Sequence, residues 1–290
     1  MARPLWFVSI LKKSFPGRFR LAGLTKLPII GNLVDYMLFD GDSIIYLPKD
    51  TAVQPNQPTH KSAVGRVVIQ INQPVEPRTD IVLPSSVVEY FIERANYIWL
   101  MNFCICRLSE QCTDYPIELG CIFLGEAVLK INPKLGRLAT KEEAFEHLQR
   151  CQDAGLVHLV GRNKLDTVWL GATPGERLLT ICNCCPCCCL WKMIPNLDIS
   201  ISKKVTRMPG VHVTVTDECI GCGICAKETV CFVGAIHMED KRAVISDACR
   251  GCGRCIESCP ESIRAIELTI DDSQFINKAI NRISHLVDIS

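Results

Sequence analysis

The 290-residue sequence contains no uninterrupted run of 18 apolar residues, so it predicts no membrane-spanning helix. It also shows no secretory signal, because Lys12 and Lys13 interrupt the apolar run Leu5–Leu11 and no small-residue cleavage site follows. The 32 lysine and arginine residues nearly balance 31 acidic residues, which gives no indication of nucleic-acid binding. G-x-G-x-x-G, P-loop and nucleophile-elbow motifs are also missing, so nothing indicates a nicotinamide, flavin or nucleotide site.

Cysteine is the residue that the sequence has in excess, with 19 copies. So many thiols without a secretory signal are typical of metal ligation in a reducing compartment and not of a disulfide framework. We therefore expect a cytoplasmic, metal-binding protein. The six histidines show no ligand spacing, so the thiols are the candidate ligands.

Composition and motifs divide the chain into four segments. Residues 1–60 are predicted to form a basic amphipathic arm and a linker, and residues 61–205 a cysteine-rich α+β domain. Residues 206–270 form a separate unit with a cysteine repeat, and residues 271–290 a C-terminal helix. The predicted fold class is therefore α+β.

The first 34 residues carry basic but no acidic side chains, with apolar residues between them (Arg3, Lys12, Lys13, Arg18, Arg20 and Lys26). Such a segment is typical of an amphipathic surface that docks peripherally on a membrane or on an acidic partner. The alternative is an arm that packs against the body of the protein. Pro16 and Gly17 break any long helix in this segment.

Two helices are predicted before the cysteine repeat. The first begins at Ser85 or Ser86 and leads the chain to Cys104, because apolar residues follow at helical spacing (Val88, Phe91, Ile92, Ala95 and Trp99). The second begins at Thr140, whose spacing to Glu143 is that of a capping box, and it ends near Gly155.

Strands are predicted on either side of these helices. Val64–Ile71 is rich in β-branched residues and is predicted as a strand. Leu156–Val160 and Thr167–Leu170 flank a turn and predict a hairpin.

The segment 206–270 contains an internal repeat. The motif Cys219–Cys225, with cysteine at every third position and glycine between, recurs 30 residues later as Cys249–Cys255. Each copy continues to a remote cysteine, Cys231 or Cys259. Apolar strands are predicted before and after each copy, which gives a βαβ-like unit in each half (Val211–Val215, Ala235–Met238, Ala243–Ile245 and Ala265–Ile270).

This spacing resembles that of the bacterial-type ferredoxin family, whose members carry two [4Fe–4S] clusters and take the fourth ligand of each cluster from the other half. The resemblance covers about 60 residues, and it implies a ferredoxin-like two-cluster fold that moves single electrons. It implies one cluster on Cys219, Cys222, Cys225 and Cys259, and another on Cys249, Cys252, Cys255 and Cys231. A zinc site is disfavoured for this motif, because zinc ligands usually come as paired C-x2-C.

The first half departs from the family pattern. Five residues separate Cys225 from Cys231 where the family has three, and Phe232 replaces the usual proline after the remote cysteine. Cys259–Pro260 keeps the usual form. We therefore expect the two clusters to differ in potential.

A second cysteine group lies upstream, within 18 residues (Cys104, Cys106, Cys112 and Cys121). A third Fe–S cluster is the favoured interpretation, and a zinc site or unligated core thiols are the alternatives. Arg107 either offsets cluster charge or lies in solvent.

A third group has six cysteines in eight residues (Cys182, Cys184, Cys185, Cys187, Cys188 and Cys189). Because neighbouring side chains of an extended segment point in opposite directions, these thiols would serve two clusters, or a cluster and a pocket. Together the second and third groups offer ligands for one or two further Fe–S clusters, either two cubanes or one irregular cluster. Cys151 falls on the apolar face of the helix after Thr140 and is predicted to be a buried core thiol.

Three functions fit these observations. The favoured one is an iron–sulfur electron-transfer protein or subunit, similar to multi-cluster ferredoxin-like proteins of anaerobes, which relays single electrons to a partner redox enzyme. The first alternative is a reductase that binds a thiol, disulfide or corrinoid substrate at the Cys182–Cys189 site. The second is a protein that delivers Fe–S clusters or metals. The missing catalytic constellations disfavour an enzyme, although an open cluster position would leave no such motif.

Overall fold

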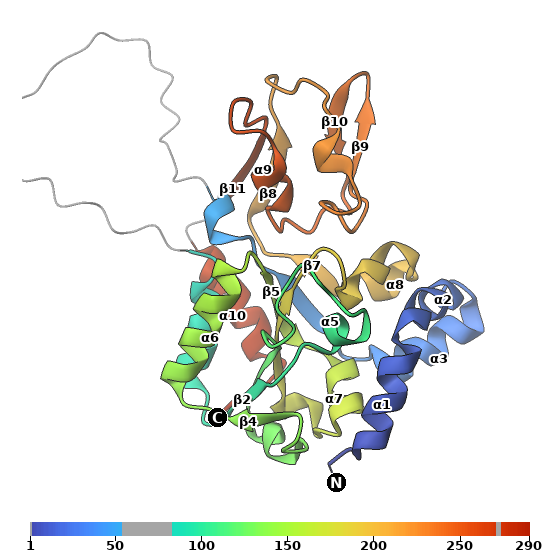
Figure 1. The fold of residues 1–290 in the computed structure, drawn as a ribbon, viewed down its shortest axis with the longest axis vertical. Helices are drawn as coiled ribbons and strands as arrows, with labels where there is room; N and C mark the ends of the chain where they lie inside the picture. Colours follow the sequence, from blue (N-terminus) through green and yellow to red (C-terminus); the bar gives the residue numbers. More distant parts are fainter. Residues whose placement is uncertain (1, 54–82, 271–273) are drawn as a thin grey trace, which may run out of the picture.

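The computed structural model describes residues 2–53, 83–270 and 274–290. It is a mixed α+β structure, as predicted, in which a seven-stranded sheet domain carries the smaller segment 206–270 at one end (Figure 1). We call that segment the C-terminal module. The predicted strand Val64–Ile71 lies outside the described residues.

The seven-stranded sheet has the order β4-β2-β3-β6-β5-β1-β7, and only the β1/β7 pair is parallel. Its strands are β1 (Ser43–Tyr46), β2 (Ile98–Met101), β3 (Ile122–Leu124), β4 (Gly136–Leu138), β5 (Val157–Arg162), β6 (Leu179–Cys184) and β7 (Val205–Arg207). Strand β1 comes from the segment that the sequence assigned to arm and linker. The domain boundaries themselves stay a prediction.

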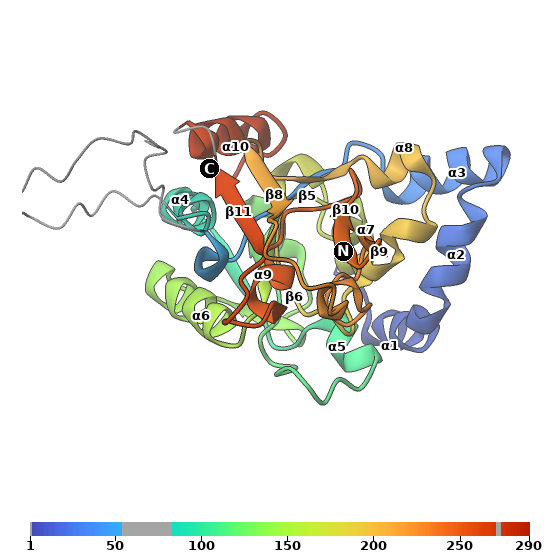
Figure 2. The same ribbon diagram turned by 90° about the horizontal axis from the view of Figure 1, so that it is seen from above.

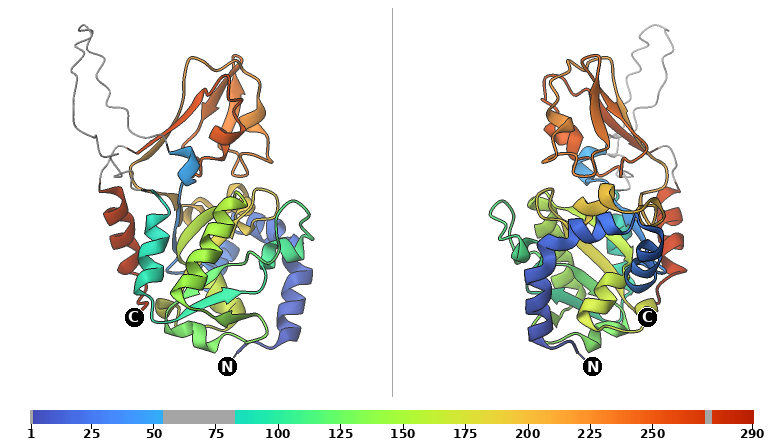
Figure 3. Two further views of the ribbon diagram at one scale, coloured as in Figure 1. Left: turned by 60° about the vertical axis from the view of Figure 1, so that its left-hand side comes forward. Right: turned by 90° about the vertical axis from the view of Figure 1, so that its right-hand side faces the viewer.

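Both faces of the sheet are buried. One face packs against helices α4 (Ser86–Arg94), α6 (Lys141–Asp153) and α10 (Phe275–Ser284). The other face lies toward the N-terminal helices, α5 (Ile105–Ser109), α7 (Lys164–Leu170) and α8 (Ile199–Ser202) (Figures 1 and 3). Alternate residues of β1 serve the two faces, since Ile45 packs with the first helices and Tyr46 with the second set.

The arm folds as three short helices: α1 (Leu5–Ser14), α2 (Arg18–Leu24) and α3 (Pro28–Leu38). As predicted, Pro16 and Gly17 interrupt the helical run, in a 3₁₀ turn (Phe15–Gly17). Further 3₁₀ turns are η2 (Asp50–Ala52), η3 (Glu126–Lys130), η4 (Gly175–Arg177), η5 (Leu190–Asn196) and η6 (Ile224–Ala226).

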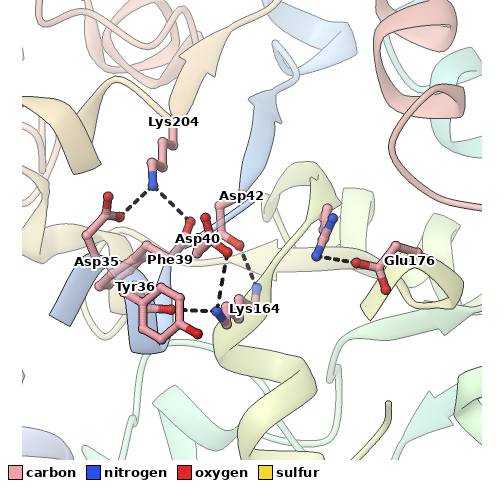
Figure 4. A network of polar contacts seen from close by, with 9 residues as sticks. Asp35, Tyr36, Phe39, Asp40, Asp42, Lys164, Glu176 and Lys204 are labelled. Carbon is pink, nitrogen blue, oxygen red and sulfur yellow. Dashed lines mark hydrogen bonds and ion pairs between the residues drawn. The ribbon is translucent and has the colours of Figure 1, made fainter. Parts of the chain in front are cut away.

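A polar network fastens the arm to the sheet domain (Figure 4). The Lys204 Nζ donates to Asp35 at 2.5 Å and to the Phe39 carbonyl at 3.1 Å. The Asp42 carboxylate accepts the backbone N–H of Lys164 at 2.6 Å. The arm therefore packs on the body, and docking of its exposed surface on a membrane or an acidic partner stays a prediction.

Two local predictions need correction. Trp99 lies in strand β2 and not on the preceding helix, which ends at Arg94 because Ala95 is already extended. Thr167–Leu170 is helical and belongs to α7, so the predicted hairpin does not form. Strand β5 pairs instead with β1 and β6. The helix after Thr140 is confirmed, including both hydrogen bonds of its capping box.

The C-terminal module contains the four predicted strands: β8 (Val211–Val215), β9 (Ile236–Glu239), β10 (Arg242–Ile245) and β11 (Ile266–Ile270). They pair across the repeat, β8 with β11 and β9 with β10, and both pairs are antiparallel. No pair joins two strands of the same half, so the halves interlock instead of forming separate βαβ units. A short helix, α9 (Arg254–Ser258), is present in the second half.

The module is attached to the sheet domain by polar and apolar contacts. Lys49 N–H donates to the Cys252 carbonyl at 3.2 Å, and the Thr51 hydroxyl donates to Glu257 at 2.6 Å. Val211 and Leu268 also join the core beneath α4 and α10. These contacts bring the cysteine loops of the module close to the sheet.

Candidate metal centres

The described cysteines gather in a few groups, which is what an Fe–S or other metal-binding protein requires. Eight lie in the C-terminal module, where the positions of the repeat bring them together. Four of the eight line one small cavity, and these are the four assigned to the first cluster (Cys219, Cys222, Cys225 and Cys259). We call them the first ligand set.

The second ligand set consists of Cys231, Cys249, Cys252 and Cys255. These thiols are near enough to influence one another's pKa: burial raises the pKa of Cys255, and the neighbouring Cys252, Cys249 and Cys231 raise it further. The remote Cys231 thus lies beside the triplet of the other half, as the resemblance implies. Whether iron occupies either set stays a prediction.

Glycines make these loops possible. Gly221 and Gly253 have φ values of +72° and +84°, in the left-handed region that favours glycine. A Cβ on Gly221 would lie 2.1 Å from the Lys241 carbonyl oxygen, and one on Gly253 would lie 2.4 Å from Ala52. Larger residues are therefore excluded at both positions.

Backbone N–H groups in the module point at thiol sulfurs. Ala235 N–H donates to Cys231 Sγ at 3.3 Å, Gly251 N–H to Cys249 Sγ at 3.4 Å, and Ala265 N–H to Cys259 Sγ at 3.3 Å. Such donors stabilise thiolates and are typical of the surroundings of Fe–S clusters. The donor set of the module therefore fits two all-cysteine clusters.

The ten cysteines of the second and third sequence groups separate into two sets. Four of them form a compact group, in which all Sγ atoms lie within 4.8 Å of one another (Cys112, Cys185, Cys187 and Cys188). Within the described parts of the chain, no other set of three or more Cys, His, Asp or Glu donors is this tight. The compact group joins one cysteine of the upstream motif to three of the Cys182–Cys189 run.

The other six thiols line a cavity of about 520 Å³, which Cys185 of the compact group also lines, and we call these six the cavity thiols (Cys104, Cys106, Cys121, Cys182, Cys184 and Cys189). Cys182 and Cys184 are two residues apart on β6 and therefore face the same side of the sheet. The Cys121 and Cys182 sulfurs are 4.0 Å apart. Side chains of α1 and α2 complete the apolar wall, including Phe7 and Leu11.

The cavity thiols differ strongly in acidity. Side-chain hydrogen bonds from Cys182 and Cys189 hold the pKa of Cys184 well below its usual range, and Arg254 and Arg107 lower it further. A hydrogen bond with Cys106 lowers the pKa of Cys104 to about 7. The cavity thus favours thiolates at two positions, as metal ligation or thiol chemistry requires.

Arg107 supplies positive charge beside these thiols. It has no exposed surface, so the interpretation of a solvated arginine is wrong. Its guanidinium donates to the Asn183 carbonyl at 2.9 Å and to the Leu119 carbonyl. Among the described residues, its Nε has no hydrogen-bond partner. That buried donor fits an acceptor inside the cavity, such as a sulfide.

A bridge between the module and the cavity was not predicted from the sequence. Tyr46 is completely buried on β1, and burial and the thiols of Cys189, Cys184 and Cys252 raise its pKa. Its ring lies 5.8 Å from that of Phe232, and the Arg254 guanidinium donates to the Cys184 carbonyl. Only the unusual Phe232 gave a sequence signal here.

Cys151 has no exposed surface, and burial raises its pKa to about 12, which confirms the predicted core thiol. In the described residues, no helix is both long and apolar enough to cross a bilayer. Comparison of the chain with protein-family models, with curated proteins and with solved structures found no match.

Proposed function

We propose that this chain is an iron–sulfur electron-transfer protein or subunit that holds two [4Fe–4S] clusters in its C-terminal module. The observation that carries this proposal is the grouping of the first ligand set around one cavity, with the second set beside it. When bound, each such cluster accepts and releases one electron. The thiolates and the backbone N–H donors of the module hold the clusters and adjust their potentials.

The direction of transfer is proposed from the bridge to the cavity. Tyr46 interacts with thiols on both sides, Cys252 in the module and Cys184 and Cys189 in the cavity. Phe232, which follows a ligand of the second set, packs against Tyr46. These contacts support a path from the second ligand set to the cavity, where one further Fe–S cluster would be held by the cavity thiols.

The unequal halves support a carrier with two distinct potentials. In the first half Phe232 is buried, and the loop between Cys225 and Cys231 is two residues longer than its counterpart in the second half. The second half keeps Pro260 after its remote cysteine. A different backbone around each set places different numbers of N–H donors near the sulfurs.

The experiment is an anaerobic redox titration of the full chain, followed by electron paramagnetic resonance. The proposal predicts two one-electron steps at separate low potentials, with about eight iron and eight sulfide per chain from the module alone. The variant Cys252→Ser should abolish one step and leave the other. A chain that holds zinc but no sulfide, or that shows no reducible centre, would contradict the proposal.

A reductase is the second candidate, and the cavity is the observation that favours it. Its apolar wall and its acidified Cys184 would suit a thiol, disulfide or corrinoid substrate. Asp166 lines the same cavity, and burial raises its pKa to about 6 although three side chains donate hydrogen bonds to its carboxylate. Substrate turnover lost in Cys184→Ser but kept in Cys151→Ala would favour this candidate, while spectra unaffected by small disulfides would favour the carrier.

A further inference from the structure

The compact group consists of three cysteines from the turn after β6, two of which form a C-x2-C pair, and of Cys112 from a loop far upstream in the sequence. Cys185 and Cys188 form a C-x2-C pair directly after β6, and the Cys188 N–H donates to Cys185 Sγ at 3.4 Å. Cys187 lies between them, and its Sγ is 3.4 Å from that of Cys112 and 3.6 Å from that of Cys188. Paired spacing of this kind is typical of structural zinc sites.

The separations fit one ion and not a cubane. With Zn–S bonds of about 2.3 Å, sulfurs at the corners of a tetrahedron lie about 3.8 Å apart. The four Sγ atoms all lie within 4.8 Å of one another, close to that value. In a cubane each thiolate binds a different iron, so its four sulfurs stand farther apart. At 3.4 Å, Cys112 and Cys187 are also well beyond the S–S bond of about 2.05 Å.

The position of the group indicates what an ion there would do. Cys112 lies on the loop between α5 and β3, which projects from the body (Figure 2). The other three ligands sit on the turn after β6, so one ion would fasten the loop to the sheet.

We propose that the compact group binds one Zn²⁺ as a closed, tetrahedral, structural site, separate from the Fe–S centres. A closed set of four protein thiolates suits structural zinc, which needs no open coordination position. The site fixes the turn between Cys184, the last residue of β6, and Cys189, both of which line the cavity. This assignment goes beyond the proposed electron transfer, and it does not depend on it.

The test is metal analysis of the full chain, purified without oxygen after growth with both iron and zinc. We expect about one zinc per chain, and zinc X-ray absorption should show four sulfurs at about 2.3 Å. Cys112→Ser combined with Cys187→Ser should lower zinc to below about 0.1 per chain while iron and sulfide stay unchanged. The matched control Cys151→Ala removes a buried thiol of the same apolar cluster and should keep the zinc.

Three outcomes would overturn the zinc assignment. Loss of about four iron and four sulfide from the double variant would show a cubane. One iron without sulfide at this site, or a disulfide between Cys112 and Cys187, would also contradict it. If the double variant does not fold, zinc X-ray absorption of the wild-type chain still shows whether zinc is bound by four sulfurs. Iron and sulfide counts are separate readouts, so failure here is distinguishable from failure of the proposed function.

A second, independent observation concerns the outer face of the arm. Large apolar side chains of α1–α3 and the turns between them are exposed there, led by Ile29 at 86%, Tyr36 at 70% and Trp6 at 65% (with Ile10, Leu24, Leu27, Leu33 and Met37). Exposed basic residues, Lys13, Arg20 and Lys26, accompany them. Large apolar side chains exposed in this number on one short segment of a folded protein indicate an interaction surface.

The geometry points to an anionic lipid bilayer as the occupant. The exposed Lys13, Arg20 and Lys26 complement anionic headgroups, whereas they would repel a second copy of the same surface. Tryptophan and tyrosine are the side chains that favour the bilayer interface. The inner side of α1 and α2 lines the 520 Å³ cavity, so docking would bring the cavity close to the membrane.

Vesicle sedimentation of the full chain tests this. We expect binding to phosphatidylcholine vesicles with about 30% phosphatidylglycerol, little binding to phosphatidylcholine alone, and weakening by salt. Trp6→Ser with Ile29→Ser should weaken binding at least about tenfold. The control Leu138→Ser, at an exposed apolar residue on β4, should bind like wild type. Absent binding to anionic vesicles, or self-association through this face instead, would refute the membrane surface.

Discussion

The C-terminal module and the sheet domain both concentrate cysteine, but they do so by different means. In the module, each ligand set is made of three cysteines from one short loop and one from the other half of the repeat, held by glycines with positive φ. In the sheet domain, the cysteines come from a loop, a strand and a turn that only the folded sheet brings together. Backbone N–H donors approach sulfurs in both regions, but the thiols of the sheet domain also lie near two buried arginines, Arg107 of the sheet domain and Arg254 of the module. Local spacing therefore specifies the first kind of site, and tertiary structure the second.

The largest expected effect tests whether the two ligand sets of the module are separate. Cys222→Ser should remove about four iron and four sulfide per chain, because Cys222 belongs only to the first ligand set. Iron and sulfide analysis measures this, with Cys151→Ala as the control that should lose none. Loss of all iron from Cys222→Ser would show that the two sets do not bind independently.

The next largest effect concerns the contribution of the buried Arg107 guanidinium to the stability of the sheet domain. Arg107→Gln leaves the carbonyls of Asn183 and Leu119 without a charged donor, so we expect unfolding free energy to fall by about 2–4 kcal/mol. Urea unfolding of the anaerobic protein measures it. Arg137→Gln, which removes an exposed ion pair with Glu143, should cost less than about 1 kcal/mol. Equal losses in both variants would contradict the role given to Arg107.

The sequence predicted the module far better than the sheet domain. The repeat predicted the four strands of the module, because spacing, glycines and apolar runs are local features, whereas the two ligand sets came from the resemblance and stay a prediction. The compact group was not predicted, because Cys112 and Cys187 are 75 positions apart and meet only through the β3–β6 pairing. Trp99 was misassigned because apolar spacing alone continues past the end of a helix, while strand pairing decides where Ile98–Met101 lies. Tyr46 carries no motif, and its importance comes only from its position between two groups of thiols.

The contributions of the arm and of the cysteine sites to stability should change with pH in opposite directions. Burial raises the pKa of Asp42 to about 8, although the Lys164 amide and Lys204 oppose this. The unfolded chain releases this proton near pH 4, so between pH 4 and 8 the folded state binds more protons and stability falls as pH rises. Above about pH 8 the contribution is constant. Thiolate–metal sites behave oppositely, because acid protonates their ligands.

Asp42→Asn should therefore gain unfolding free energy relative to wild type as pH rises from 4 to 8. We expect a gain of about 2–4 kcal/mol, below the roughly 6 kcal/mol that about 1.4 kcal/mol per pKa unit would allow, because local opening admits water. Urea unfolding at several pH values gives the difference. A difference that does not change with pH would refute the raised pKa.

The smallest expected effect concerns the bridge between the two regions. The Tyr46 hydroxyl is buried without a hydrogen-bond partner among the described residues. Tyr46→Phe should therefore change unfolding free energy by less than about 0.5 kcal/mol, or stabilise slightly, and should leave the iron content unchanged. Urea unfolding and iron analysis measure both. A loss above about 1 kcal/mol would mean that the hydroxyl donates to a bound group.

The central claim is that the C-terminal module holds two four-iron clusters while the sheet domain holds its metals in separate sites. Iron, acid-labile sulfide and zinc counted on one anaerobic sample of the full chain, together with its reduced electron paramagnetic resonance spectrum, test it most directly. The account predicts at least about eight iron, an equal amount of sulfide, about one zinc and two interacting [4Fe–4S] signals. Fewer than about four iron per chain, or iron without sulfide, would contradict it.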